Sequence, residues 1–155
     1  MTPVVFRAPL DSDLRHIAEH MRAIDALECT LTVERSPYEA LLQSVEHSDW
    51  CEVALVDDQP QCVFGAATLH ESLLGDDGAP WMLGAQSMCR HAKALLIHSR
   101  PKVEAMRWRY QRLFNIVHAH NRASIRWLKW LGFSFGDEVK VKGHPFLQFE
   151  MAGHV

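Results

Sequence analysis

The chain has no excess of basic residues and no long apolar run. Its 155 residues carry 16 Lys and Arg against 19 Asp and Glu, which gives a formal net charge of −3 at pH 7. This balance lacks the basic footprint with which proteins neutralise nucleic-acid phosphates. No apolar run approaches the roughly 20 residues of a membrane span, and the N-terminus lacks the basic and apolar regions of a signal peptide. We therefore expect a cytoplasmic protein with no nucleic-acid partner and no membrane span.

The sequence also lacks paired cysteine motifs. Its four cysteines are Cys29, Cys51, Cys62 and Cys89, and no two of them form a CxxC pair. None has the sequence context that marks a catalytic nucleophile. We expect reduced thiols in a cytosolic protein. The alternative is a disulfide between Cys51 and Cys62 across a hairpin.

What the chain does contain is ordinary for a globular protein: 48% hydrophobic and 23% charged residues. A length of 155 residues is enough to bury one proper core. The sequence shows no repeat, low-complexity tract or linker. We expect a single domain over residues 1–155.

Apolar periodicity and turn residues predict alternating helices and strands. In the first half we expect a strand at 4–8, a helix from 11–13 through Leu27, a helix from 36 to 47, strands at 50–56 and 61–70, a loop at 71–80 and a strand at 81–85. In the second half we expect a helix at 87–99 that Pro101 interrupts, a continuation at 103–112, a strand at 113–120, a helix to 131 and a hairpin of 134–141 and 146–151. These patterns alone support a mixed α/β protein with an antiparallel hairpin.

The most specific stretch runs from Asn121 to Phe133 and reads NRASIRWLKWLGF. Asn121 can cap a helix, because its side chain can accept a hydrogen bond from a free N–H of the first turn. Ile125, Leu128 and Leu131 recur at helical spacing and give that helix a buried stripe. Gly132 then ends the helix, since glycine adopts left-handed backbone angles without a Cβ clash.

This stretch resembles the second conserved motif of the GNAT (Gcn5-related N-acetyltransferase) superfamily, Asn-x-x-Ala-x-x-x-Tyr-x-x-x-Gly-Phe. Asn121, Gly132 and Phe133 fall in register with the motif. Ser124 takes the Ala position and Leu128 takes the Tyr position.

A longer stretch, from Trp81 to Phe149, is also similar to the GNAT-like virion-associated proteins of T7-type tailed bacteriophages. The resemblance implies the GNAT fold, an α/β (α+β) architecture. Its central mixed sheet is twisted and mostly antiparallel, with six to seven strands flanked by about four helices.

The resemblance implies acetyl-CoA binding where the fourth strand ends and the next helix begins. GNAT enzymes usually place a Gln/Arg-x-x-Gly-x-Gly/Ala loop there, whose backbone N–H groups bind the pyrophosphate at the helix N-terminus. The corresponding segment here, 84–91, has no Gly-x-Gly and looks shortened. An alternative interpretation is a plain strand-to-helix turn with a surface arginine. The residues that would bind the cofactor are Leu83, Gly84, Ala85, Ser87, Arg90 and Asn121.

Candidate catalytic groups are few. Many GNAT enzymes use the motif Tyr as a general acid, and Leu128 cannot donate a proton. The candidate general bases are His70 and Glu71, at the end of the third strand, and His118. For His70 and Glu71 the alternative is a solvated strand end. His118 and His120 share one face of a strand, but no Cys or acid at ligand spacing joins them. We expect no metal site.

Two functions of different classes follow from the resemblance. The first is an N-acetyltransferase that moves an acetyl group from acetyl-CoA to a primary amine. The second is a phage-encoded protein without catalytic activity, which acts in virion assembly or as an internal virion or host-interaction protein. It would lie in the host cytoplasm or the virion. A shared fold does not decide between them.

Overall fold

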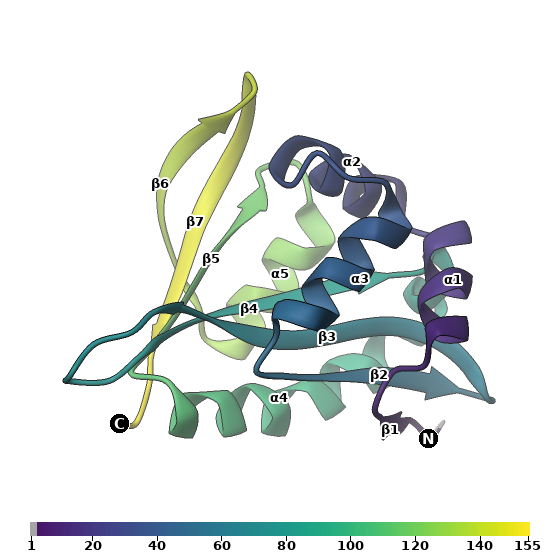
Figure 1. The fold of residues 1–155 in the computed structure, drawn as a ribbon, viewed down its shortest axis with the longest axis horizontal. Helices are drawn as coiled ribbons and strands as arrows, with labels where there is room; N and C mark the ends of the chain where they lie inside the picture. Colours follow the sequence, from purple (N-terminus) through teal and green to yellow (C-terminus); the bar gives the residue numbers. More distant parts are fainter. Residues whose placement is uncertain (1–2) are drawn as a thin grey trace. The chain divides into compact units, whose positions relative to one another are not determined.

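A computed structural model describes residues 3–155 of the chain (Figure 1). Its elements along the chain are β1 (Val5–Arg7), α1 (Asp11–Glu19), α2 (Ala23–Thr32), α3 (Pro37–His47), β2 (Trp50–Val56), β3 (Gln59–His70), β4 (Asp77–Gly84), the 3-10 helix η1 (Gln86–His91), α4 (Ala92–Arg109), β5 (Arg112–His118), α5 (Arg122–Leu131), β6 (Ser134–Val141) and β7 (His144–Ala152).

The strand order in the sheet is β1-β2-β3-β4-β5-β7-β6. Antiparallel pairs predominate, and β4 with β5 is a parallel pair. The mixed, mostly antiparallel seven-stranded sheet confirms the predicted fold class. The chain divides into two compact units, unit 1 (Met1–Ala66 and Trp81–Ser99) and unit 2 (Ala67–Pro80 and Arg100–Val155). The expectation of a single domain stays a prediction.

Unit 1 is built around the antiparallel strands β1, β2 and β3, and α1 packs against α3. Its buried core joins residues of these two helices and of β2 and β3: Leu14, Ile17, Leu41, Val53, Leu55 and Val63. Local signals explain where its elements begin. Ser36 caps α3 by accepting a hydrogen bond from the N–H of Glu39, and Pro37 occupies the first turn.

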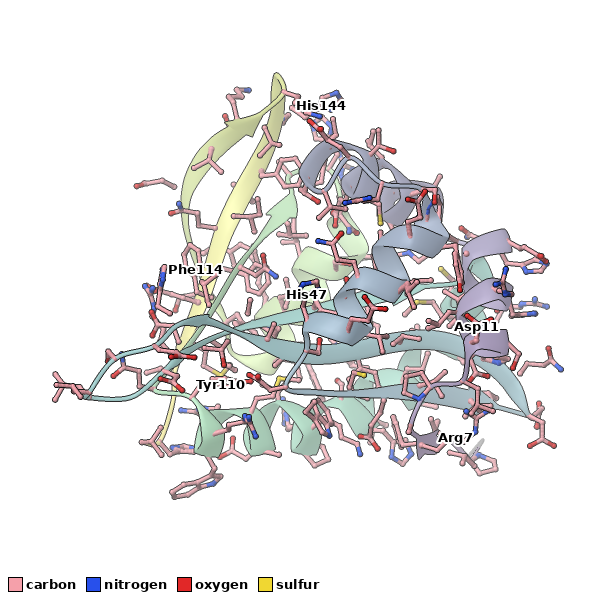
Figure 2. All side chains as sticks on the ribbon, viewed as in Figure 1. Arg7, Asp11, His47, Tyr110, Phe114 and His144 are labelled. Carbon is pink, nitrogen blue, oxygen red and sulfur yellow. The ribbon has the colours of Figure 1, made fainter. Side chains whose placement is uncertain are left out.

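An ion-pair network ties β1 to the first turn of α1. Arg7 donates from both terminal nitrogens to the carboxylate of Asp13, at 2.6 and 3.1 Å. Asp11, which begins α1, accepts from Arg15 one turn later and from the hydroxyl of Tyr38 on α3. Figure 2 labels Arg7 on β1 and Asp11 at the start of α1.

In unit 2, β5 lies between the beginning of β4 and the strand β7. Asp77 pairs with Arg112 and Gly78 with Leu113 in parallel, and β7 runs antiparallel along the whole of β5. The strands β6 and β7 form the predicted closing hairpin, which Figure 1 shows in yellow-green (β6) and yellow (β7). Tyr110, Leu113 and Phe146 are fully buried in this unit.

The helix at the motif begins and ends as predicted, but its apolar stripe of Ile125, Leu128 and Leu131 is half-buried and not buried as expected. Asn121 caps α5, with its Oδ1 accepting a hydrogen bond from the N–H of Ser124 at 3.3 Å. Gly132 ends the helix with φ of +103°, a left-handed angle that favours glycine.

Three element predictions are wrong in detail. The helix predicted from 11–13 through Leu27 is two helices, because the chain leaves helical geometry at 20–22 and pairs with the end of β4. The loop predicted to Pro80 ends earlier, since β4 already begins at Asp77. Pro101 does not interrupt α4. Residues 3–155 consequently form five α-helices, against about four expected.

All four cysteines are free thiols, so the alternative of a Cys51–Cys62 disulfide is not formed. In the β2–β3 register, Cys51 lies opposite Gly65, and Cys62 lies opposite Ala54. Among residues 3–155, no helix combines the length and apolar character that crossing a membrane requires.

Candidate functional site

The end of β4 in unit 1 is where the resemblance places the cofactor. The N–H of Ala85 donates to the carbonyl of Gln61 on β3, at 2.8 Å. Successive residues of a strand direct their backbone groups to opposite edges. The N–H and C=O of Gly84 and the N–H of Gln86 therefore point to the edge of β4 opposite β3.

A segment between α1 and α2 pairs with this edge. The N–H of Arg22 donates to the carbonyl of Gly84 at 2.9 Å, and the N–H of Gln86 donates to the carbonyl of His20 at 2.8 Å. Between them, Met21 and Ala85 form an antiparallel bridge. The backbone of His20–Arg22 thus acts as a short extra strand beside β4.

A buried carboxylate completes the contacts at this edge. Asp25 is 2% exposed, and its Oδ2 accepts a hydrogen bond from the N–H of Gly84 at 3.0 Å. Its Oδ1 lies 3.7 Å from Nη1 of Arg22, which is also buried. Burial raises the pKa of Asp25, and the nearby Arg22 charge and the Gly84 hydrogen bond partly oppose that rise.

Side-chain packing fixes the conformation of the segment after β4. A Cβ on Gly84 would lie 2.1 Å from the sulfur of the buried Met88, so the strand end passes this side chain closely. The hydroxyl of Ser87 donates to Oε1 of Gln61 at 2.7 Å. Arg90 is exposed in the last turn of η1, and Leu83 packs against the core of unit 1.

The proposed base residues and Asn121 belong to unit 2. His70 ends β3 and Glu71 follows it, and both are exposed. Asn121 is buried, its side chain caps α5 and its N–H donates to the carbonyl of His118 at 2.9 Å. The cofactor and catalytic roles assigned to the candidate residues stay predictions.

A side chain in β5 replaces a backbone partner next to β4, and the sequence analysis missed it. Asn115 donates from Nδ2 to the carbonyl of Pro80 at 2.8 Å, and its Oδ1 accepts from the N–H of Ile116 at 2.8 Å. Pro80 has no N–H to offer to a neighbouring strand. A polar residue inside the apolar run LFNIV is the signal that could have indicated this contact.

Three histidines gather where β5 ends and β7 begins. Nε2 of His118 lies 3.3 Å from Nδ1 of His144, and the rings of His118 and His120 are 5.2 Å apart. Nδ1 of His118 accepts a hydrogen bond from the N–H of His120, so neutral His118 carries its proton on Nε2 and donates it to His144. Figure 2 shows His144 beside the turn of the hairpin. Among residues 3–155, no three His, Cys, Asp or Glu are arranged to hold a metal ion.

We predict that this cluster destabilises the protein in acid. Burial, followed by His120 and His144, lowers the pKa of His118 below its ordinary value of 6.5. The unfolded chain therefore binds this proton more readily than the folded one, and stability falls as the pH drops below about 6.5 towards the lowered value. His118→Phe, which keeps an aromatic ring beside Phe146, should flatten the dependence in urea unfolding between about pH 7.5 and 5. His70→Gln, an exposed control, should leave it unchanged.

Comparison with known proteins shows the fold. No family model and no curated protein matches the chain. Among solved structures, aminoglycoside acetyltransferase AAC(6')-Ib in complex with coenzyme A is 17% identical with a TM-score of 0.68, covering 97% of this chain and 95% of that one. Ribosomal-protein-alanine N-acetyltransferase from Brucella melitensis is 19% identical with a TM-score of 0.64, covering 96% and 99%. A GNAT-family acetyltransferase from Streptococcus pneumoniae is 10% identical with a TM-score of 0.62, covering 97% and 99%. The chain has the GNAT fold.

Part of the backbone that would bind acetyl-CoA is already paired within the protein. The N–H groups of Gly84, Ala85 and Gln86 bond to Asp25, Gln61 and His20, and the carbonyl of Gly84 accepts from Arg22. In this conformation these four groups do not fit the cofactor, because each already has a partner. A carboxylate also occupies the position beside the Gly84 N–H, which disfavours another anion there.

Proposed function

We propose that the protein is a GNAT-type acyltransferase that moves an acetyl group from acetyl-CoA to a primary amine. The observation that carries the proposal is the likeness of nearly the whole chain to proteins named as acetyltransferases, one of them as an N-acetyltransferase. The motif at Asn121–Gly132, which forms a capped helix as in the family pattern, adds support.

Exposed side chains at the end of β3 would act on the acceptor amine. The exposed side chains of His70 and Glu71 are the groups that would take a proton from the attacking amine. Leu128 supplies no acid, and Tyr110 does not replace it, because its ring is fully buried against Gly78.

A thermal melt with CoA and with acetyl-CoA tests the proposal. A ligand at about 100 times its dissociation constant stabilises the native state by roughly 2.7 kcal/mol, which raises the midpoint of a 155-residue protein by several degrees. ATP at the same concentration controls for general nucleotide binding. Arg90→Gln should reduce the shift, and Arg126→Gln, an exposed arginine on α5, should not. No shift in a cooperatively melting protein would reject acyl-CoA binding.

A second function is favoured by the occupied β4 edge and by Leu128. In this case the protein keeps the GNAT fold without catalysis and works by binding other proteins. The resemblance to T7-type phage proteins would make these partners virion components. Copurification of phage structural proteins with the tagged chain from infected cells would support this function, and their absence would count against it.

A further inference from the structure

The break between α1 and α2 has no local cause in the sequence. Leu14, Ile17, Met21, Ile24 and Leu27 keep helical spacing across it. Neither Gly nor Pro lies at 20–22, and the side chain of Arg22 does not cap α2. The chain nevertheless leaves the helix at His20 (φ −117°, ψ 17°) and is extended at Arg22 (ψ 136°).

The cause lies in the contacts that the break creates. The residues freed from the helix form the Met21–Ala85 bridge and its two backbone hydrogen bonds, which β4 would otherwise lack on this edge. An uncovered strand edge exposes unpaired N–H and C=O groups that can accept another extended chain. Residues His20–Arg22, which we call the edge segment, pair with these N–H and C=O groups of β4 within the same molecule.

Asp25 holds the edge segment in place. A carboxylate that is 2% exposed is costly unless it is paired and hydrogen-bonded. Asp25 meets this requirement with the segment docked, because its Oδ2 accepts from the Gly84 N–H on β4 and its Oδ1 lies beside Arg22 on the segment itself. Undocking would therefore break three backbone contacts of β4 together.

We infer that the edge segment is an internal gate on β4: docked, it closes the backbone edge at Gly84–Gln86, and an extended ligand arm such as the pantetheine of acyl-CoA pairs with this edge only after the segment leaves. The identity of the ligand rests on the proposed function. The gate itself rests on the contacts of unit 1 alone. With a gate of this kind, the apparent dissociation constant equals the intrinsic one divided by the fraction of molecules in which the gate is open.

Amide hydrogen exchange followed by NMR tests the gate in the unmodified protein. With the segment docked, the Gln86 and Gly84 amides should exchange at least about tenfold more slowly than an unbonded amide in an exposed loop. Saturating acetyl-CoA should speed exchange of the Arg22 amide, which loses its acceptor, and leave that of Val63 in the core unchanged. Fast exchange of Gln86 without ligand would overturn the gate. Ligand binding that leaves the Arg22 amide protected would also overturn it.

Two matched variants isolate the backbone contact. Arg22→Pro is compatible with the φ of −54° at this position but removes the N–H that bonds to Gly84, whereas Arg22→Ala keeps it. Both are made with Asp25→Asn, so that no buried carboxylate is left without its partner. The Pro variant should exchange its Gln86 amide about fivefold to tenfold faster than the Ala variant. Equal exchange rates in the two folded variants would overturn the gate.

The affinity of the two variants for acetyl-CoA tests the gate separately from the identity of the ligand. If both inferences hold, the Pro variant should bind acetyl-CoA about fivefold to tenfold more tightly than the Ala variant, in proportion to its faster exchange. Faster exchange with no acetyl-CoA binding in either variant supports the gate and rejects the proposed acyltransferase function. Tighter binding without faster exchange would reject the gate and leave the function standing.

Discussion

Gly78→Ala is expected to lower the free energy of unfolding by about 3 kcal/mol and the melting midpoint by about 10 °C. A Cβ at this position would lie 2.5 Å from Cγ of Tyr110 and 2.6 and 2.7 Å from its two Cδ atoms. No carbon–carbon contact is this short in a relaxed structure, where the optimum is about 3.5–4.0 Å. Either the ring or the beginning of β4 must therefore move.

The Tyr110 ring has no room to retreat. It is 1% exposed, and its backbone is held at the end of α4 by a hydrogen bond to the carbonyl of Met106. Gly153 passes so close that a Cβ there would lie 1.8 Å from the carbonyl oxygen of Tyr110. Moving β4 instead would disturb its pairing of Gly78 with Leu113.

Gly136→Ala is the matched control, because it adds the same methyl group to strand β6 of the same unit. The nearest atom to that methyl, Cβ of Gln148, would be 3.8 Å away, an ordinary contact. Urea unfolding of the two variants measures the difference. A loss below about 1 kcal/mol for Gly78→Ala would contradict the packing described for Tyr110.

Arg22→Ala is expected to destabilise the protein by about 3 kcal/mol at pH 7, because it leaves the buried carboxylate of Asp25 without its cationic partner. The side chains of both residues are less than 10% exposed. The Gly84 N–H alone then offsets the cost of keeping this charge out of water.

The sign of the pH dependence identifies the carboxylate as the cause. The pKa of Asp25 is already raised in the folded protein by burial, and loss of Arg22 removes one of the two influences that oppose the rise. The folded state then holds the proton more tightly than the unfolded state. Stability is therefore greatest below the ordinary carboxyl value of 3.8 and falls as the pH rises through the raised folded value. The deficit of Arg22→Ala should grow from low to neutral pH.

Two further variants test this explanation. Asp25→Asn added to Arg22→Ala should abolish the pH dependence of the deficit, since neither charge of this buried pair remains. Arg35→Ala removes an exposed ion pair with Glu39 and should leave stability unchanged within error. A deficit in Arg22→Ala that is equal at pH 4 and pH 7 would mean that lost packing of the arginine stem, and not the carboxylate, causes it.

Sequence alone predicted the elements whose signals are local. The strand Trp50–Val56 and the helix between Asn121 and Gly132 were predicted at their observed positions, because alternation, capping and a left-handed glycine act over a few residues. The fold class followed from the motif. The roles of the candidate site residues could not be predicted from local signals, because these roles depend on contacts with residues of other elements.

The missed features all involve contacts between distant segments. The break at Met21 is caused by Ala85, the role of Asn115 by Pro80, and the histidine cluster by His144 approaching the buried His118. None of these partners lies within 20 residues of the other. Helical spacing at Met21 was correct as a pattern, but tertiary pairing overrode it.

The four free thiols differ in reactivity, which allows a dye to be attached at one position. Burial raises the pKa of Cys29 and Cys62 to about 12 and also raises that of the half-buried Cys51, whereas Cys89 is exposed. Because the thiolate is the species that reacts, a maleimide or iodoacetamide dye at neutral pH should label Cys89 first. Cys89 lies in η1, three residues beyond Gln86. The native sequence therefore accepts a single fluorophore next to the closed edge of β4, without engineered cysteines.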